Sequence, residues 1–205
     1  MPDQLPLSEN FIRDHNASRG TEGLEDEYQS LSRQLRRRGI DIESIRAKVA
    51  AFSVALPTWG AGRGGTRFAK FPFDGAPTCI HEKLEDCAVV QQLCRITPRV
   101  SPHFPWDFVE DYAALAERAA NLGLGFDAVN SNTFQDQLHQ KLSYAGGSLS
   151  SPHAAVRDQA IAHNIECIRI GKLLGSHAIT VWGATGRIRG WRLVPQGGAP
   201  IWVQQ

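Results

Sequence analysis

The chain has 205 residues, of which 42% are hydrophobic and 21% charged, with a formal net charge of +1. This is the composition of an ordinary globular protein, long enough to bury the core of one domain or slightly more. The near-neutral charge gives no reason to expect nucleic acid as a partner. Because no apolar run reaches the about 18 residues of a membrane span and the polar N-terminus lacks a signal-peptide core, we expect a cytoplasmic protein with no membrane partner.

Residues 1–51 form the first region, which is polar and predicted to be helical. One helix is expected over 24–38, ended by Gly39, and a second over 42–51, capped by Asp41. Neither helix carries a cluster of reactive side chains. We interpret this region as a helical arm that packs on something larger.

A different pattern begins at Phe52, where predicted strands and helices alternate. Strands are expected over 52–56, 99–104, 125–130 and 177–182; helices over 82–93, 111–122 and 154–174; and long loops over 58–77 and 131–151. Regular alternation implies parallel strands joined by right-handed crossovers. The candidate folds are therefore a doubly wound sheet and a (β/α) barrel.

Polar and aromatic side chains gather at the predicted C-terminal ends of these strands. They are Trp59, His103, Trp106, Asn130, Asn132 and Trp182. In both candidate folds this end of the sheet carries the chemistry. Rings interspersed with hydrogen-bonding groups predict a pocket for a carbohydrate-like ligand. The alternative interpretation is structural: a capped strand end with a tryptophan packed against it.

The glycine-rich stretch 59–66 follows a strand but does not open into a helix, as a dinucleotide-binding loop must. A lid or a subunit-contact loop that carries Phe68, Phe71 and Phe73 explains it better. The four cysteines form no CxxC pair, so we expect buried free thiols. GxSxG and HExxH motifs are absent from the sequence.

Six short runs together resemble the bacterial L-rhamnose isomerases of the xylose-isomerase-like barrel superfamily. They are ALPTWG at 55–60, GGTRF at 64–68, KLED at 83–86, PHFPWD at 102–107, NSNTF at 130–134 and TVW at 180–182. The resemblance covers about residues 10–182 in order. It implies a partial (β/α)8 TIM barrel over 52–182, comprising about the first four strands.

The resemblance also implies roles for individual residues. Trp59 and Trp106 would wall a sugar pocket, His103 would hydrogen-bond the substrate, and Trp182 would line the floor. Phe68 would reach into the site of a neighbouring subunit. Members of the family are homotetramers that interconvert L-rhamnose and L-rhamnulose. The resemblance does not extend the tetramer to a chain of this length.

Chemistry in this family uses two divalent cations, usually manganese, which polarise the sugar oxygens. Such ions take carboxylates and histidines, which the family draws from its later strands. The 23 residues after Trp182 (205 minus 182) contain no Asp, Glu or His. We therefore expect that this chain binds no metal, has no catalytic residues of its own and is inactive alone.

Residues 183–205 are expected to be an irregular tail. Shifting the reading frame within 183–188 permits Gly-Asp-Gly-Ser-Asn, a turn typical of the family at this point, so a one-base deletion is one hypothesis for the tail. Three interpretations remain open: a truncated isomerase, a half-barrel completed by a separate C-terminal fragment or a second copy, and a sugar-binding protein without catalysis.

Overall fold

A computed structural model describes residues 5–61, 74–137 and 140–183. Its elements are α1 (Glu9–Ala17), α2 (Glu22–Arg37), α3 (Ile42–Ala50), β1 (Ala55–Pro57), α4 (Thr58–Ala61), α5 (Ile80–Cys94), β2 (Arg99–Ser101), α6 (Tyr112–Asn121), β3 (Gly125–Phe126), β4 (Val129–Thr133), α7 (Ala154–Leu173) and β5 (Ile179–Gly183). Among the helices in these three ranges, none is both long and apolar enough to cross a membrane.

The strands run parallel and follow one another in chain order across the body of the molecule. β1 pairs with β2 and β2 with β3, while β4 pairs with β5. An isolated parallel bridge between His103 and Asn130 joins the two groups. β3 and β4 thus act as one interrupted strand, and the order is β1, β2, β3/β4, β5.

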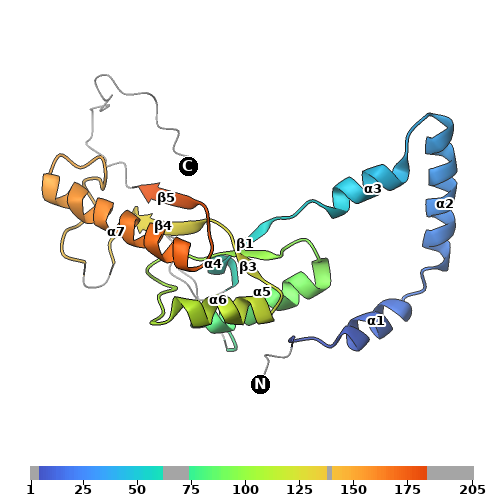
Figure 1. Cartoon of the computed structure of the whole chain (residues 1–205), viewed down its shortest axis with the longest axis horizontal. Coiled ribbons are helices and arrows are strands. Elements are labelled where there is room, and N and C mark those ends of the chain that lie inside the picture. The colour runs from blue at the N-terminus through green and yellow to red at the C-terminus, as the bar shows by residue number, and fades with distance from the viewer. Residues whose placement is uncertain (1–4, 62–73, 138–139, 184–205) are drawn as a thin grey trace.

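Helices α5, α6 and α7 cover one face of these strands (Figure 1). Leu56, Val100 and Phe126 turn toward this helical layer and join a core that includes Leu84, Leu115 and Cys167. Gly171 in α7 lets the helix come close to β4, because an added Cβ would lie 3.2 Å from a methyl carbon of Val129. Close packing of this kind fixes the distance between helix and strand.

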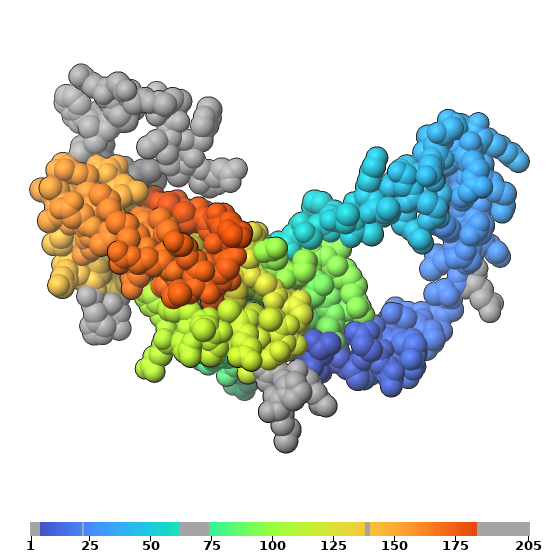
Figure 2. All heavy atoms as spheres, viewed as in Figure 1, coloured from blue at the N-terminus to red at the C-terminus, as the bar shows by residue number. Residues whose placement is uncertain are grey.

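Helices α1 to α3 form an arm that projects from the body (Figures 1 and 2). The start of the arm is tied to α5, where Gln92 exchanges two hydrogen bonds with the Leu7 backbone at 3.0 and 2.7 Å. The arm returns to the body through α3, which leads into β1. Between these attachments Figure 2 shows an open space bounded by the arm and the body.

Most predicted elements are present, with corrections at their ends. The first strand begins at Ala55 instead of Phe52 and includes Pro57, and the expected loop 58–77 opens with α4. The strand expected over 125–130 is interrupted, so that it forms β3 and β4, and it extends to Thr133. Cys87 and Cys167 are buried as expected, whereas Cys79 and Cys94 are exposed.

Two of the predicted features lie outside the described residues. Phe68, Phe71 and Phe73 lie outside the described residues, as does the tail beyond Gly183. Gly183 itself belongs to β5. The strand order agrees with that of a (β/α) barrel. Because the strands form no closed barrel within the described ranges, the partial barrel stays a prediction.

Two leucines on α5 provide a test of the core. Leu84 is fully buried, whereas Leu93 is 61% exposed. We expect Leu84→Ala to lower the free energy of unfolding by about 2–5 kcal/mol, because it leaves a cavity that the rigid core cannot fill. Leu93→Ala should change it by less than about 0.5 kcal/mol. Urea unfolding measures both, and equal losses would contradict this packing.

Candidate functional site

Five rings meet where the strands end. His103, after β2, lies edge-on to Trp59 at 5.1 Å and to Trp106 at 4.5 Å between ring centroids. Phe134, after β4, stacks on His103 at 6.3 Å and contacts Trp182 of β5 at 6.0 Å between ring centroids. We call these five residues the ring cluster.

His103 is the buried centre of the ring cluster, with 5% of its surface exposed. Within the described part of the chain neither ring nitrogen makes a hydrogen bond of normal geometry, although the Ser131 backbone lies close enough to raise the pKa of the ring. Burial lowers the pKa of His103 from 6.5 to about 4, although the nearby Asp107 carboxylate acts in the opposite direction. The imidazole is therefore neutral at pH 7, with one nitrogen able to donate and the other to accept a hydrogen bond.

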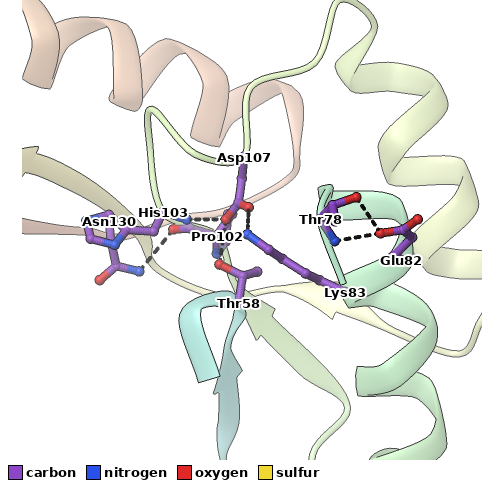
Figure 3. A network of polar contacts seen from close by, with 8 residues as sticks. All are labelled: Thr58, Thr78, Glu82, Lys83, Pro102, His103, Asp107 and Asn130. Atoms are coloured by element: carbon purple, nitrogen blue, oxygen red, sulfur yellow. Dashed lines mark hydrogen bonds and ion pairs between the residues drawn. The ribbon is translucent and has the colours of Figure 1, made fainter. Parts of the chain in front are cut away.

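Asp107 links the residues that follow β1 and β2 (Figure 3). Its carboxylate accepts hydrogen bonds from the Thr58 hydroxyl at 2.5 Å and the His103 backbone N–H at 2.7 Å. It also pairs with the Lys83 ammonium at 2.7 Å, and both side chains are almost fully buried. Since Thr58 precedes Trp59 and Asp107 follows Trp106, this one carboxylate positions both indoles and the histidine.

Lys83 lies in the first turn of α5. Beside it, the Glu82 carboxylate accepts hydrogen bonds from the Thr78 backbone N–H at 2.6 Å and the Thr78 hydroxyl at 2.8 Å, which ties the residues before the helix to its first turn. Both contacts lower the pKa of Glu82. The next residue, Lys83, then points from the first turn of α5 toward Asp107 (Figure 3).

Asn130 links Trp182 of the ring cluster to Pro102, just after β2. Its side-chain amide donates to the Pro102 carbonyl at 3.1 Å, and its side-chain oxygen accepts the Trp182 indole N–H at 3.2 Å. Two residues further along β4, the backbone N–H of Asn132 donates a hydrogen bond to the His163 ring of α7 at 3.0 Å. The orientation of Trp182 is thus fixed by a buried amide.

The structure brings together four of the five residues proposed to bind substrate: Trp59, His103, Trp106 and Trp182. Phe68, the fifth, lies outside the described residues. Phe134 was not predicted, although it ends the NSNTF run, because a phenylalanine in a loop carries no signal of its own. Asp107 and Lys83 were also missed as a pair, since 24 residues separate them in sequence.

The described residues do not fit a resident metal ion. In 5–61, 74–137 and 140–183, no three His, Cys, Asp or Glu side chains are gathered so that they could hold one. The acid nearest the ring cluster, Asp107, already uses both oxygens on Lys83, Thr58 and His103. We derive no step through a metal, and the family's manganese remains an expectation from the resemblance.

The fold and the ring cluster define an α/β protein whose aromatic site lies at the C-terminal ends of parallel strands. The chain is 56% identical over 182 residues to a protein of Rhizobium meliloti (strain 1021) named a probable sugar isomerase, covering 89% of this chain and 42% of the relative. It is 54% identical over 180 residues to another probable sugar isomerase, from Mesorhizobium japonicum (strain LMG 29417 / CECT 9101 / MAFF 303099), with 88% and 41% covered.

The chain therefore spans about two fifths of the length of the curated relatives that it matches. No protein-family model matches it. The matched segments of 182 and 180 residues are long enough to include both the arm and the ring cluster.

Replacing Asp107 by Asn tests the buried ion pair. We expect Asp107→Asn to lower the free energy of unfolding by about 3–5 kcal/mol, because it leaves the Lys83 ammonium buried without its counter-charge. Lys83→Met in the same chain should recover part of that loss. Asp14→Asn is the matched control, since Asp14 pairs with Arg13 on the surface with side chains more than 70% exposed, and should cost less than about 1 kcal/mol.

The buried histidine makes stability depend on pH. Because the pKa of His103 falls from 6.5 to about 4 on folding, the unfolded chain takes up the proton first as pH falls. The neutral His103 therefore contributes fully to the free energy of unfolding above pH 6.5, and this contribution is lost as the pH falls toward 4. Between pH 7 and pH 5 the free energy of unfolding should fall by about 2 kcal/mol. Burial also lowers the pKa of His163, which adds to the same slope.

Urea unfolding of the wild-type protein and of His103→Gln at several pH values between 7 and 5 measures this dependence. The variant should show a shallower slope, whereas the exposed control His177→Gln should keep the wild-type slope. An unchanged slope in His103→Gln would contradict a buried neutral imidazole.

Proposed function

We propose that the ring cluster binds a sugar and that the chain forms part of a sugar isomerase. The observation that carries this proposal is His103, whose two buried ring nitrogens make no hydrogen bond of normal geometry within the described residues while aromatic rings surround it. Both relatives described above are named probable sugar isomerases. A sugar offers what this arrangement lacks, namely hydroxyl groups for the imidazole and C–H faces for the indoles.

The tryptophans and the histidine would contact different parts of such a ligand. Trp59, Trp106 and Trp182 are half-buried, so each keeps part of its ring available to an apolar sugar face. The neutral His103 imidazole donates one hydrogen bond and accepts another. Because Asp107 and Asn130 hold the backbone and the rings in place beforehand, little conformational entropy is lost on binding.

L-rhamnose is the substrate that the sequence resemblance supports, with conversion to L-rhamnulose as the reaction of the complete enzyme. The sequential parallel strands agree with the first part of a (β/α) barrel. In that fold the ring cluster lies on the side of the barrel where catalysis occurs. The metal ligands for isomerisation would come from outside the described residues.

A second candidate is a sugar-binding protein without catalysis. It is supported by the lack of a metal-ligating group in the described ranges, while the ring cluster is intact. An isomerase assay of the purified chain with manganese and L-rhamnose distinguishes the two. Formation of the ketose would overturn the second candidate.

Titration of the chain with L-rhamnose, followed by calorimetry and by tryptophan fluorescence, tests sugar binding. We expect saturable binding that changes the indole emission. His103→Phe keeps a ring at this position but removes both hydrogen-bonding nitrogens, so it should weaken binding about tenfold or more.

The matched control is His153→Phe, because His153 is exposed at the start of α7 and outside the ring cluster. It should leave the affinity unchanged. Equal affinity of the wild type and His103→Phe would exclude His103 as a sugar ligand, and absence of saturable binding would reject the proposed function.

A further inference from the structure

The hydrogen bonds between the segment after β2 and β4 follow a parallel ladder as far as Phe104. The Asn130 backbone N–H donates to the Pro102 carbonyl, and the Phe104 N–H donates to the Asn130 carbonyl, both at 2.9 Å. In a parallel ladder the next bond would run from the Asn132 N–H to the Phe104 carbonyl. The Asn132 N–H donates instead to a side chain of α7.

His163 of α7 occupies the place of that bond. Its Nε2 accepts the Asn132 N–H at 3.0 Å. Burial lowers the pKa of His163, and the Phe104 backbone lies close enough to the ring to act in the opposite direction. The imidazole therefore lies between the two backbone segments that a continued ladder would join directly.

The ladder is interrupted because the chain turns after His103. The Asp107 backbone N–H donates to the His103 carbonyl at 3.1 Å, while β4 runs on to Thr133. Asn132 is only 2% exposed, and a buried backbone N–H without an acceptor is costly. His163 thus supplies the acceptor that the segment after β2 would otherwise provide.

This hydrogen bond specifies the state of the His163 ring. A ring nitrogen accepts a hydrogen bond only when it carries no proton, so the neutral imidazole holds its proton on Nδ1. Burial favours the neutral ring against the opposing effects of Glu166 on the same helix and of the Phe104 backbone. The neighbouring Cys167 thiol, 3.6 Å from Nε2, is neutral as well, because burial raises its pKa to about 12.

The two segments that His163 separates carry two members of the ring cluster. His103 directly precedes Phe104, and Phe134 follows Asn132 by two residues. The two rings stack with centroids 6.3 Å apart and planes 23° apart. The Asn132 side-chain amide also donates to the Gln135 carbonyl at 3.1 Å, so the position of Asn132 determines that of Phe134. An imidazole between the segments holds them further apart than a direct backbone hydrogen bond would.

We propose that His163 is a positioning residue of the sugar site: its neutral imidazole replaces the next backbone partner in the ladder and thereby sets the spacing between His103 and Phe134. The proposal rests on the proposed function in that the ligand of the ring cluster is a sugar. The spacing itself is a property of the chain without ligand, and His163 acts through the two rings.

NMR spectroscopy of the intact, ¹⁵N-labelled chain at pH 7 tests the spacing without a ligand. We expect a scalar coupling across the hydrogen bond between the Asn132 amide nitrogen and Nε2 of His163, with the ring proton on Nδ1. In His163→Leu the ring-proton signals of His103 should shift, because Phe134 moves relative to them. Absence of the coupling in the wild type would overturn the proposal.

Ile170→Ala is the matched control for that shift. Ile170 is buried on the same helix, so its truncation weakens the core but leaves the His163 hydrogen bond in place. The His103 signals should keep their wild-type positions in this variant. Equal shifts in Ile170→Ala and His163→Leu would overturn the proposal, and if His163→Leu fails to fold, the coupling decides.

Titration with L-rhamnose, followed by calorimetry, measures the consequence for binding. His163→Leu should weaken binding about tenfold. His163→Gln should recover part of the loss, because its side-chain oxygen can accept the Asn132 N–H. The exposed control His153→Leu should keep the wild-type affinity.

The outcomes separate this proposal from the proposed function. Equal affinity of the wild type and His163→Leu, with the His103 signals shifted, would show that binding does not depend on the spacing and would overturn the proposal. If the wild type does not bind L-rhamnose, the proposed function fails, while the coupling and the His103 signals still decide whether His163 positions the two rings.

Discussion

The ring cluster depends on a single buried carboxylate. Asp107 is 1% exposed and contacts a residue from each of three separate parts of the chain: Thr58 after β1, Lys83 of α5 and His103 after β2. Taking this ion pair out of water is costly, and hydrogen bonds to both carboxylate oxygens offset that cost. The carboxylate specifies where two strands end and how their indoles lie against His103, more than it contributes to stability.

A site of rings organised in this way is suited to sugars because its polar centre is neutral. The low pKa of His103 keeps the imidazole uncharged, so a hydroxyl group can bind without displacing a counter-ion. In the proposed function, sugar binding would use the ring cluster, whereas isomerisation would need cation ligands that the described residues do not assemble.

The body and the arm differ in how they bury apolar surface. In the body, α5, α6 and α7 enclose a continuous core against one face of the strands. In the arm, Leu24, Val49 and Phe52 are each more than 60% exposed, and the arm helices contact the body mainly at α1 and through β1. An isolated amphipathic helix is marginally stable in water, so the arm gains less stability from packing than the body does.

Local sequence signals determined much of this protein. The Asp41 cap located α3 and apolar periodicity located α6, because both effects act over one or two turns. Alternation of strands and helices predicted parallel strands, and therefore placed Trp59, His103, Trp106 and Trp182 at one end of the sheet. Only the tertiary structure decided which face of α7 is buried: Ile161, Ile165 and Ile168 are exposed, whereas Ala160, Cys167 and Gly171 pack inward. Likewise, the Lys83–Asp107 pair and the contact of Phe134 with His103 join residues far apart in sequence, and such partners are chosen by packing across the whole sheet, which no local pattern encodes.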